Sequence, residues 1–321
     1  MPQGFTYNII DVDRFATRAM YGKVLAEIGQ TNPEIVVLTA DMMRSNKTGD
    51  FAKVIPERFF NFGIAEQNMM AAAAGLAVSG KIPYVSTFAT FASLRCAEQL
   101  RTDIAYPNLK VRIVSSHAGL SMGNGGTTHH ATEDIAICRS MANMTVIVPA
   151  DANECAKAVY ESIDYPGPIY MRLGRGAEPI VYKKDYEFSI GKAVTVREGR
   201  DVSIIACGIL VMAAIKAARK LAQEGIEANV IDMHTIKPLD AEAVIAAAQK
   251  TGVVLTAEEH NIIGGLGGAV SEVLATSGVP VKFSRIGIPD VYSTIGSPDD
   301  LYAYYGLDAE GIYKKVKDLV I

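Results

Sequence analysis

One carboxylate stands at the start of a predicted helix that otherwise carries few polar side chains. Glu66 follows the turn Phe62-Gly63 and precedes a run of Ala, Met and Leu that continues to Ala77. We expect a helix of this composition to be buried nearly all round. An acid in its first turn either interacts with the positive end of the helix dipole or is kept for acid–base chemistry. Glu66 is therefore the first candidate catalytic residue, with a capping role as the alternative.

A glycine-rich loop with two adjacent histidines provides a second set of candidates. The loop follows a predicted buried strand at 111–116, starts with His117 and ends with His129 and His130. Four of its residues are glycines, Gly125 among them. Glycine lets the backbone approach a ligand closely, and loops on a rigid scaffold often carry binding residues. We therefore expect this loop to contact a ligand.

Further candidates lie near the ends of predicted parallel strands. The buried run at 34–40 ends at Asp41, and Ser45 follows in a polar loop. Ligands bind to open α/β sheets at the carboxyl ends of the strands, so both are candidates, with helix capping as the alternative. After the next strand, at 82–86, three side chains share one face of a predicted helix by i, i+3 spacing: Phe88, Phe91 and Leu94. An aromatic pair at this spacing packs more often in a core than against a cofactor.

The alternation of buried strands and helices predicts an α/β protein with two parallel-sheet domains. A chain of 321 residues is long enough for both. We place the first domain at 1–180, a linker without periodicity at 181–191, and a second, smaller domain at 192–321. In the second domain we expect strands at 202–206, 228–233, 252–257 and 281–286, with helices that start near 209, 240, 268 and 308.

The composition argues against several classes of protein. A net charge of −4 gives no basic surface of the kind that nucleic-acid binding requires. No stretch of about 18 apolar residues could span a membrane, and residues 1–12 lack the pattern of a signal peptide. The four cysteines lie far apart and form no metal-binding spacing with the histidines. We expect reduced cysteines, a cytoplasmic protein and no metal ligand in this chain.

Taken together, these motifs resemble the transketolase family of thiamine-diphosphate enzymes over nearly the whole chain. Residues 62–69 are similar to the motif in which a glycine turn presents the catalytic glutamate, and 87–94 resemble the segment whose aromatic side chains hold the aminopyrimidine ring. Residues 117–129 resemble the substrate loop, including the spacing of its two histidines. Residues 234–240 and 258–268 resemble the C-terminal domain of the same superfamily. The resemblance implies a pyrimidine-binding domain followed by a transketolase C-terminal domain.

The resemblance also implies an activity and a role for each candidate residue. The activity is the transfer of a two-carbon ketol unit between phosphorylated or otherwise anionic sugars. The implied catalytic residues are Glu66, which contacts N1′ of the aminopyrimidine, and His129. The implied cofactor-binding residues are Asp41, Glu66, Phe88, Phe91 and Leu94. The implied substrate-binding residues are Arg18, Ser45, His117, Gly125, His129 and Arg175.

One part of the family pattern is not found in this sequence. Family members built as one chain carry an N-terminal domain whose Gly-Asp-Gly and Asn motif holds the metal and the diphosphate. Without that motif, the chain resembles the second subunit of a split transketolase. The resemblance implies an N-terminal transketolase subunit as partner, with Mg²⁺ or Ca²⁺ held by that partner, thiamine diphosphate shared across the interface, and an α2β2 heterotetramer.

Three residues depart from the family pattern. Gly125 stands where the family usually has an aspartate that binds a sugar hydroxyl, Thr127 replaces a proline, and Leu94 replaces an aromatic residue found in many relatives. Loss of a hydrogen-bonding carboxylate can change discrimination between substrates by orders of magnitude. We therefore expect an atypical sugar, and we leave the choice between a phosphate and a sulfonate tail open.

Other functions remain open from the sequence alone. The β subunit of a 2-oxoacid dehydrogenase shares the two-domain layout and needs a partner. The 1-deoxyxylulose-phosphate synthase branch is a second rival, but it keeps its N-terminal domain in one chain. A non-catalytic assembly subunit is the alternative from a different class. Retention of both Glu66 and His129 argues against that last alternative.

Overall fold

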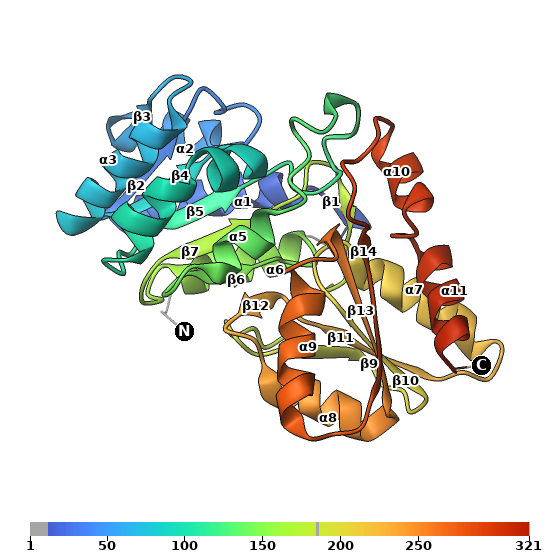
Figure 1. Ribbon diagram of the computed structural model, residues 1–321. Helices are drawn as coiled ribbons and strands as arrows, with labels where there is room; N and C mark the ends of the chain where they lie inside the picture. The colour runs from blue at the N-terminus through green and yellow to red at the C-terminus, as the bar shows by residue number, and fades with distance from the viewer. Residues whose placement is uncertain (1–11, 184–185, 321) are drawn as a thin grey trace.

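The computed structural model of the chain describes residues 12–183 and 186–320. Two sheets with helices on both faces make up the structure, one built mainly from the N-terminal half and one from the C-terminal half (Figure 1). The predicted fold class is confirmed. Residues 184 and 185 of the predicted linker lie outside the described residues, as do residues 1–11, where we expect no signal peptide. Within the described part of the chain, no helix has the length and apolar character needed to cross a membrane.

The larger sheet has seven strands in the order β12-β6-β7-β5-β4-β2-β3. Neighbouring strands are parallel except for β12 and β6. The strands are β2 (Ile35–Thr39), β3 (Phe59–Asn61), β4 (Ile82–Ser86), β5 (Arg112–Ser115), β6 (Thr145–Ile147), β7 (Ile169–Arg172) and β12 (Thr235–Lys237). Every residue of β2, β4, β5, β6 and β7 is buried, because helices cover both faces of this parallel sheet.

The helices of the N-terminal half form two separate cores on the larger sheet. On one face, the core contains side chains of α1 (Thr17–Thr31), α2 (Gly49–Val54) and α6 (Ala152–Ser162). On the other face it contains side chains of α3 (Glu66–Val78) and α5 (Asp134–Ser140). The carboxyl ends of the strands, where the candidate residues were predicted, therefore lie at one edge of a rigid layer.

The smaller sheet has five strands in the order β14-β13-β10-β11-β9, parallel except for β9 and β11. The strands are β9 (Val194–Arg197), β10 (Val202–Ala206), β11 (Ala228–Asp232), β13 (Val253–Asn261) and β14 (Lys282–Ile288). Side chains of α7 (Leu210–Ala222) and α11 (Ala309–Val320) share one core, and side chains of α8 (Ala241–Thr251) and α9 (Leu266–Ser277) contribute to another. The sequence did not predict β9, β12 or α10 (Pro298–Tyr304).

The two halves are tied together by main-chain pairing. Strand β12 belongs to the C-terminal half of the chain, yet it pairs with β6 at the edge of the larger sheet, with Thr235 opposite Ile147. A separate two-stranded sheet lies within the N-terminal half, where β1 (Arg14–Phe15) pairs antiparallel with β8 (Glu178–Pro179). Short 3₁₀ turns lie at Pro56–Arg58 and Gly123–Gly125.

The helix predicted from 87 to about 106 is irregular. Phe91–Arg95 and Leu100–Ala105 are π-helical, with α4 (Ala97–Gln99) between them. A π turn holds more residues than an α turn, so side chains three apart no longer lie on one line. The shared face predicted for Phe88, Phe91 and Leu94 therefore holds for the two phenylalanines and not for Leu94, which is 51% exposed.

The prediction that α3 is buried nearly all round is wrong. Met69, Met70 and Ala73 of this helix are fully buried against the sheet. The opposite side is open, with Val78 74% exposed and Ile64, just before the helix, 77% exposed. The side of α3 away from the sheet carries the polar Gln67 and Asn68 in the first turn and the apolar Val78 at the end.

Candidate active site

Glu66 lies at the beginning of α3, with its side chain 2% exposed. The turn before it contains Gly63 at φ +67°, a left-handed conformation that favours glycine. The carboxylate accepts a charge-assisted hydrogen bond from Arg95, with 2.6 Å between Oε1 and Nη1. An ion pair with another segment is a more specific role than capping of the helix to which the acid belongs.

Arg95 is a further candidate residue of the site that the sequence alone did not reveal. Its side chain is 43% exposed, and its guanidinium carbon lies 4.2 Å from the centre of the Phe91 ring. The guanidinium therefore connects the Glu66 carboxylate to the aromatic pair by an ion pair and a cation–π contact. The spacing of four residues from Phe91 was the available signal, and the contact to Glu66 had none in the sequence.

Four rings form a continuous aromatic surface beside this acid. The rings of Phe88 and Phe91 are stacked with centroids 5.7 Å apart. His117 lies 4.1 Å from Phe88, and His129 lies 5.5 Å from Phe91, both measured between ring centroids. The structure thus brings two of the predicted cofactor residues, Phe88 and Phe91, into direct contact with the two predicted loop histidines. Leu94 is half exposed, beyond the π turn.

His117 is held in a neutral state by its surroundings. Its backbone has φ +60°, and its Nδ1 lies 2.7 Å from the Ser116 hydroxyl oxygen. Burial, together with the nearby positive charges of Arg18 and Arg175, lowers the pKa of His117 to about 3. A neutral imidazole has one N–H donor and one acceptor. His117 can therefore donate a hydrogen bond to an anion without carrying a charge.

The predicted substrate residues from three separate segments meet beside His117. Arg18, on α1, donates from Nε to the Arg175 carbonyl at 2.7 Å and from Nη1 to the Ser45 carbonyl at 2.6 Å. Ser45 thus contributes its main-chain oxygen to this arrangement. Burial and the charge of Arg175 both lower the pKa of Arg18, as expected for two cations that lie close together. Such a pair favours the binding of an anion.

A cavity of about 790 Å³ extends from these arginines toward the C-terminal half. Arg18 and Arg175 border it from the N-terminal half, and Glu259 and Tyr302 border it from the C-terminal half. Glu178 also lines it, and burial raises the pKa of this carboxyl group to about 7. The C-terminal half therefore forms part of the wall around the candidate substrate site.

Gly125 lies in the 3₁₀ turn of the loop and is exposed. A Cβ atom at this position would lie 2.6 Å from Cγ of Met122 and 3.3 Å from Cβ of His129. An aspartate could be accommodated only if Met122 moved, so a thioether side chain occupies part of that space. Thr127, the other departure in this loop, donates from its hydroxyl to the Ser293 carbonyl at 2.8 Å.

Asp41 follows β2 and is exposed at φ +57°. Its backbone N–H donates to Oδ1 of Asn61 at 2.9 Å, and the same oxygen accepts from the N–H of Gly63 at 3.1 Å. Asn61 thus connects the end of β2 to the turn that presents Glu66. The structure places Asp41 next to that turn.

The residues present suit the pyrimidine part of thiamine diphosphate. A buried carboxylate, a stacked aromatic pair and a planar cation surround one place in the structure, through Glu66, Phe91 and Arg95. Among residues 12–183 and 186–320, no three His, Cys, Asp or Glu side chains are grouped so that they could hold a metal ion.

Comparisons with known proteins agree with this arrangement. The pyrimidine-binding domain of transketolase matches residues 13–179, and the transketolase C-terminal domain matches residues 191–312. One subunit of the apulose-4-phosphate transketolase of Phocaeicola vulgatus is 42% identical over 95% of this chain and 97% of its own length. The subunit SqwH of a 6-deoxy-6-sulfo-D-fructose transketolase from a Clostridium species is 40% identical over 94% of each chain.

A solved structure with the same fold has been described as an inactive β4 tetramer of a split-gene transketolase. It superposes with a TM-score of 0.87 at 47% identity, and it covers 95% of this chain and 98% of its own. The predicted family is confirmed by these matches. The chain therefore belongs to the transketolase family, as the counterpart of the subunit that carries the pyrimidine-binding and C-terminal domains in split transketolases.

Proposed function

We propose that this chain is the C-terminal subunit of a thiamine-diphosphate-dependent transketolase that moves a two-carbon ketol unit between sugars with an anionic tail. The observation that carries the proposal is the contact of the stacked Phe88–Phe91 pair with His117 and His129, next to the buried Glu66. This arrangement places an acid, an aromatic platform and two imidazoles around one site. Acid–base chemistry on a planar ring next to a sugar needs these groups.

On the cofactor side, each residue has a distinct task. When bound, thiamine diphosphate supplies the electron sink that stabilises a carbanion. Glu66 would share a proton with N1′ of the aminopyrimidine, and the rings of Phe88 and Phe91 would hold that heterocycle. We assign Asp41 and Leu94 to the border of the same site. The turn at Gly63 fixes where the carboxylate points.

On the substrate side, the arginine pair and His117 hold the anionic tail. Arg18 and Arg175 supply positive charge, and the neutral His117 adds one N–H donor, with Ser45 close by. Two relatives are named for an apulose 4-phosphate and a 6-deoxy-6-sulfo-fructose, which both carry a tetrahedral anionic group. These names support an anionic sugar and leave phosphate and sulfonate as the two options.

At the reacting end of the sugar, His129 supplies an imidazole to the carbonyl and hydroxyl groups. Gly125 contributes no side chain there, and Met122 presents a thioether beside it. A carboxylate that binds a hydroxyl is thus replaced by an apolar contact. We infer that the natural sugar lacks a hydroxyl at that place or presents it in another direction.

A partner subunit completes the site. We assign the diphosphate and its Mg²⁺ or Ca²⁺ ion to an N-terminal transketolase subunit, in an α2β2 complex. Ile64 and Val78, near the two ends of α3, are strongly exposed apolar side chains, and we assign this side of the helix to the contact with the partner. The inactive β4 relative is consistent with a chain that is not active alone. The four buried, unpaired cysteines support the cytoplasm as its compartment.

The test reconstitutes the chain with the subunit encoded next to it. We expect saturable binding of thiamine diphosphate with Mg²⁺ only when both subunits are present, and ketol transfer from a phosphorylated or sulfonated ketose to an aldose. Decarboxylation of a 2-oxoacid without ketol transfer would instead identify the β subunit of a 2-oxoacid dehydrogenase. Absence of partner-dependent cofactor binding would identify an assembly subunit.

A further inference from the structure

The substrate loop closes on itself at its base. The backbone N–H of Gly119 donates to the carbonyl of Ala131 at 3.0 Å, so the start and the end of the loop meet. His129 lies between these two residues, and His117 precedes them by only two positions. The position of both histidines therefore depends on how this base is held.

A carboxylate from the C-terminal half holds the first segment of that base, at Gly119 and Leu120. Glu259, on β13, accepts at Oε1 from the backbone N–H of Leu120 at 2.8 Å and from the hydroxyl of Tyr302 at 2.7 Å. A Cβ atom on Gly119 would lie 2.2 Å from the Glu259 carboxyl carbon. Glycine at 119, with φ +57°, is thus what allows the carboxylate to reach the loop backbone.

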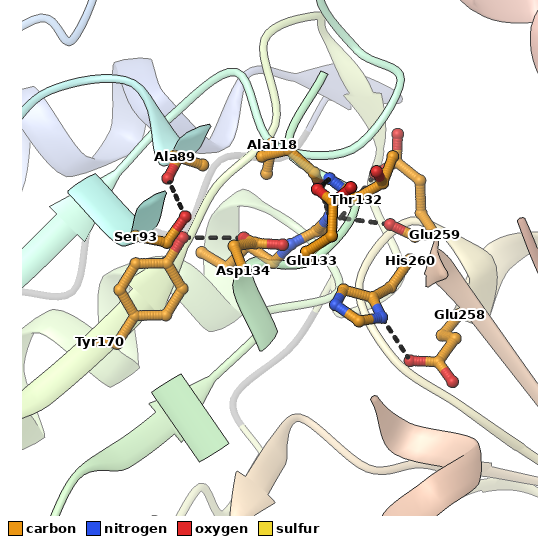
Figure 2. A network of polar contacts seen from close by, with 12 residues as sticks. Ala89, Ser93, Ala118, Thr132, Glu133, Asp134, Tyr170, Glu258, Glu259 and His260 are labelled. Carbon is orange, nitrogen blue, oxygen red and sulfur yellow. Dashed lines mark hydrogen bonds and ion pairs between the residues drawn. The ribbon is translucent and has the colours of Figure 1, made fainter. Parts of the chain in front are cut away.

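Arg172, on β7, holds the second segment of the base, at Ala131. Its Nη2 donates to the Ala131 carbonyl at 3.0 Å and to the Glu259 carbonyl at 2.7 Å, and its Nε donates to Asp134 at 2.8 Å. The Arg172 and Glu259 side chains approach to 3.5 Å and are only 4% and 5% exposed. Figure 2 shows Asp134 and Tyr170 of this network on one side and Glu259 and His260 on the other.

We propose that Glu259 is a positioning residue for ketol transfer, and that it sets the place of the loop histidines from the opposite half of the molecule. The carboxylate touches the loop only through its main chain, so it acts through His117 and His129. Because the network is buried and its partners are charged, neutralising Glu259 removes one of the two carboxylates that pair with Arg172 in the described part of the chain and weakens the acceptor of the Leu120 N–H. The loop base then loses its fixed geometry.

The neighbouring residue Glu258 offers a matched control. It is also buried, and it accepts from the N–H groups of Leu266 and Gly267 at 2.7 and 2.8 Å. These contacts lie at the start of α9 within the C-terminal half. Loss of this carboxylate therefore has a comparable structural cost and leaves the contact to Leu120 in place.

The experiment measures backbone amide hydrogen exchange in the full chain and in three variants. In Glu259→Gln, we expect exchange across residues 118–133 to rise about tenfold or more, as for the loss of one charge-assisted hydrogen bond. Tyr302→Phe, a milder change that removes one donor, should raise loop exchange to a smaller degree. Glu258→Gln should raise exchange at Leu266 and Gly267 and leave the loop as in the wild type.

The kinetic part of the test rests on the proposed function. In the complex with the partner subunit, Glu259→Gln should raise the KM for the sugar about tenfold and leave thiamine-diphosphate affinity unchanged. If wild-type complex shows no ketol transfer, the proposed function fails, while the exchange result still stands for the loop. Loop exchange that is unchanged in both Glu259→Gln and Tyr302→Phe, or raised equally by Glu258→Gln, overturns the proposal. If Glu259→Gln does not fold, Tyr302→Phe decides.

Discussion

The substrate loop (residues 117–129) and the Glu66 side of the site differ in how far their charged groups are buried within this chain. In the loop network, the ion-paired side chains of Arg172 and Glu259 are 4% and 5% exposed. At the other edge, Glu66 is equally buried, but its partner Arg95 is 43% exposed, and Val78 of the same helix is 74% exposed. The charged groups of the loop network are buried within this chain, whereas the Glu66 side has a half-exposed arginine and an exposed valine.

Under the proposed function, this difference separates the tasks of the two subunits. The loop histidines, which we assign to the sugar, are held by contacts from both halves of this chain. Glu66, which we assign to the cofactor, lies at the start of a helix whose other side is open. We therefore expect substitutions at the Glu66 edge to act on cofactor and assembly, and substitutions near the loop to act on the sugar.

The largest effect should follow from Glu66→Gln. The amide keeps the shape of the side chain but cannot exchange a proton, so kcat of the reconstituted complex should fall about 10²- to 10⁴-fold at saturating thiamine diphosphate. Glu98→Gln, which changes an exposed acid on α4, is the control and should behave as wild type. Full activity of Glu66→Gln would show that this residue has no part in the reaction, and the proposed division between the Glu66 side and the substrate loop would then fail.

A smaller effect is expected from Arg175→Met on the substrate side. Loss of one charge-assisted contact to the anionic tail should raise the KM for the sugar about 10- to 100-fold, with the cofactor dissociation constant unchanged. Arg200→Met is the control, because this exposed arginine pairs with Asp201 and does not line the cavity. A change in cofactor affinity without a change in KM would show that the two edges are not separate.

Substitution at the open face of α3 should weaken assembly. Val78→Asp places a charge in the proposed contact with the partner and should raise the dissociation constant of the complex about tenfold or more. Tyr304→Asp changes a side chain of equal exposure, 74%, on α10 in the other half, and should leave assembly intact. Sedimentation velocity across a concentration series measures both. Equal weakening by the two variants would contradict a specific role for α3.

The smallest effect near neutral pH concerns His117, whose pKa is lowered from 6.5 to about 3. Below pH 6.5 the His117 side chain takes up a proton in the unfolded chain but not in the folded chain, so the free energy of unfolding falls as the pH falls. The loss should reach about 1.4 kcal/mol per pH unit between these two values. His117→Asn should lack this component in urea unfolding at pH 7 and pH 5. Identical slopes for both proteins would mean that His117 is charged in the folded state.

The sequence was informative where a function depends on neighbours in the chain. The turn before Glu66 and the shared face of Phe88 and Phe91 follow from local spacing, whereas the contact of both loop histidines with that pair does not. The contacts of Arg95 with Glu66 and of Glu259 with Leu120 join residues that are distant in sequence. No periodicity specifies such pairs, since they depend on how helices and halves pack.

Fold prediction had the same limit. The buried strands of both sheets were evident from their apolar runs, because helices cover both faces. The exposed side of α3 was missed, since small and apolar residues such as Ala71 and Val78 have the same composition whether they are buried or open. The antiparallel strands β9 and β12 were also missed, because each is short and pairs at a sheet edge.

The pairing of β12 with β6 bears on how the chain is made in the cell. Strand β6 leaves the ribosome long before Thr235–Lys237, so the edge of the larger sheet stays unpaired while much of the second half is still being synthesised. An open strand edge invites pairing with other chains. A chain that ended before residue 235 would therefore keep this edge unpaired and would tend to aggregate. We expect any natural division of this gene into two to lie elsewhere.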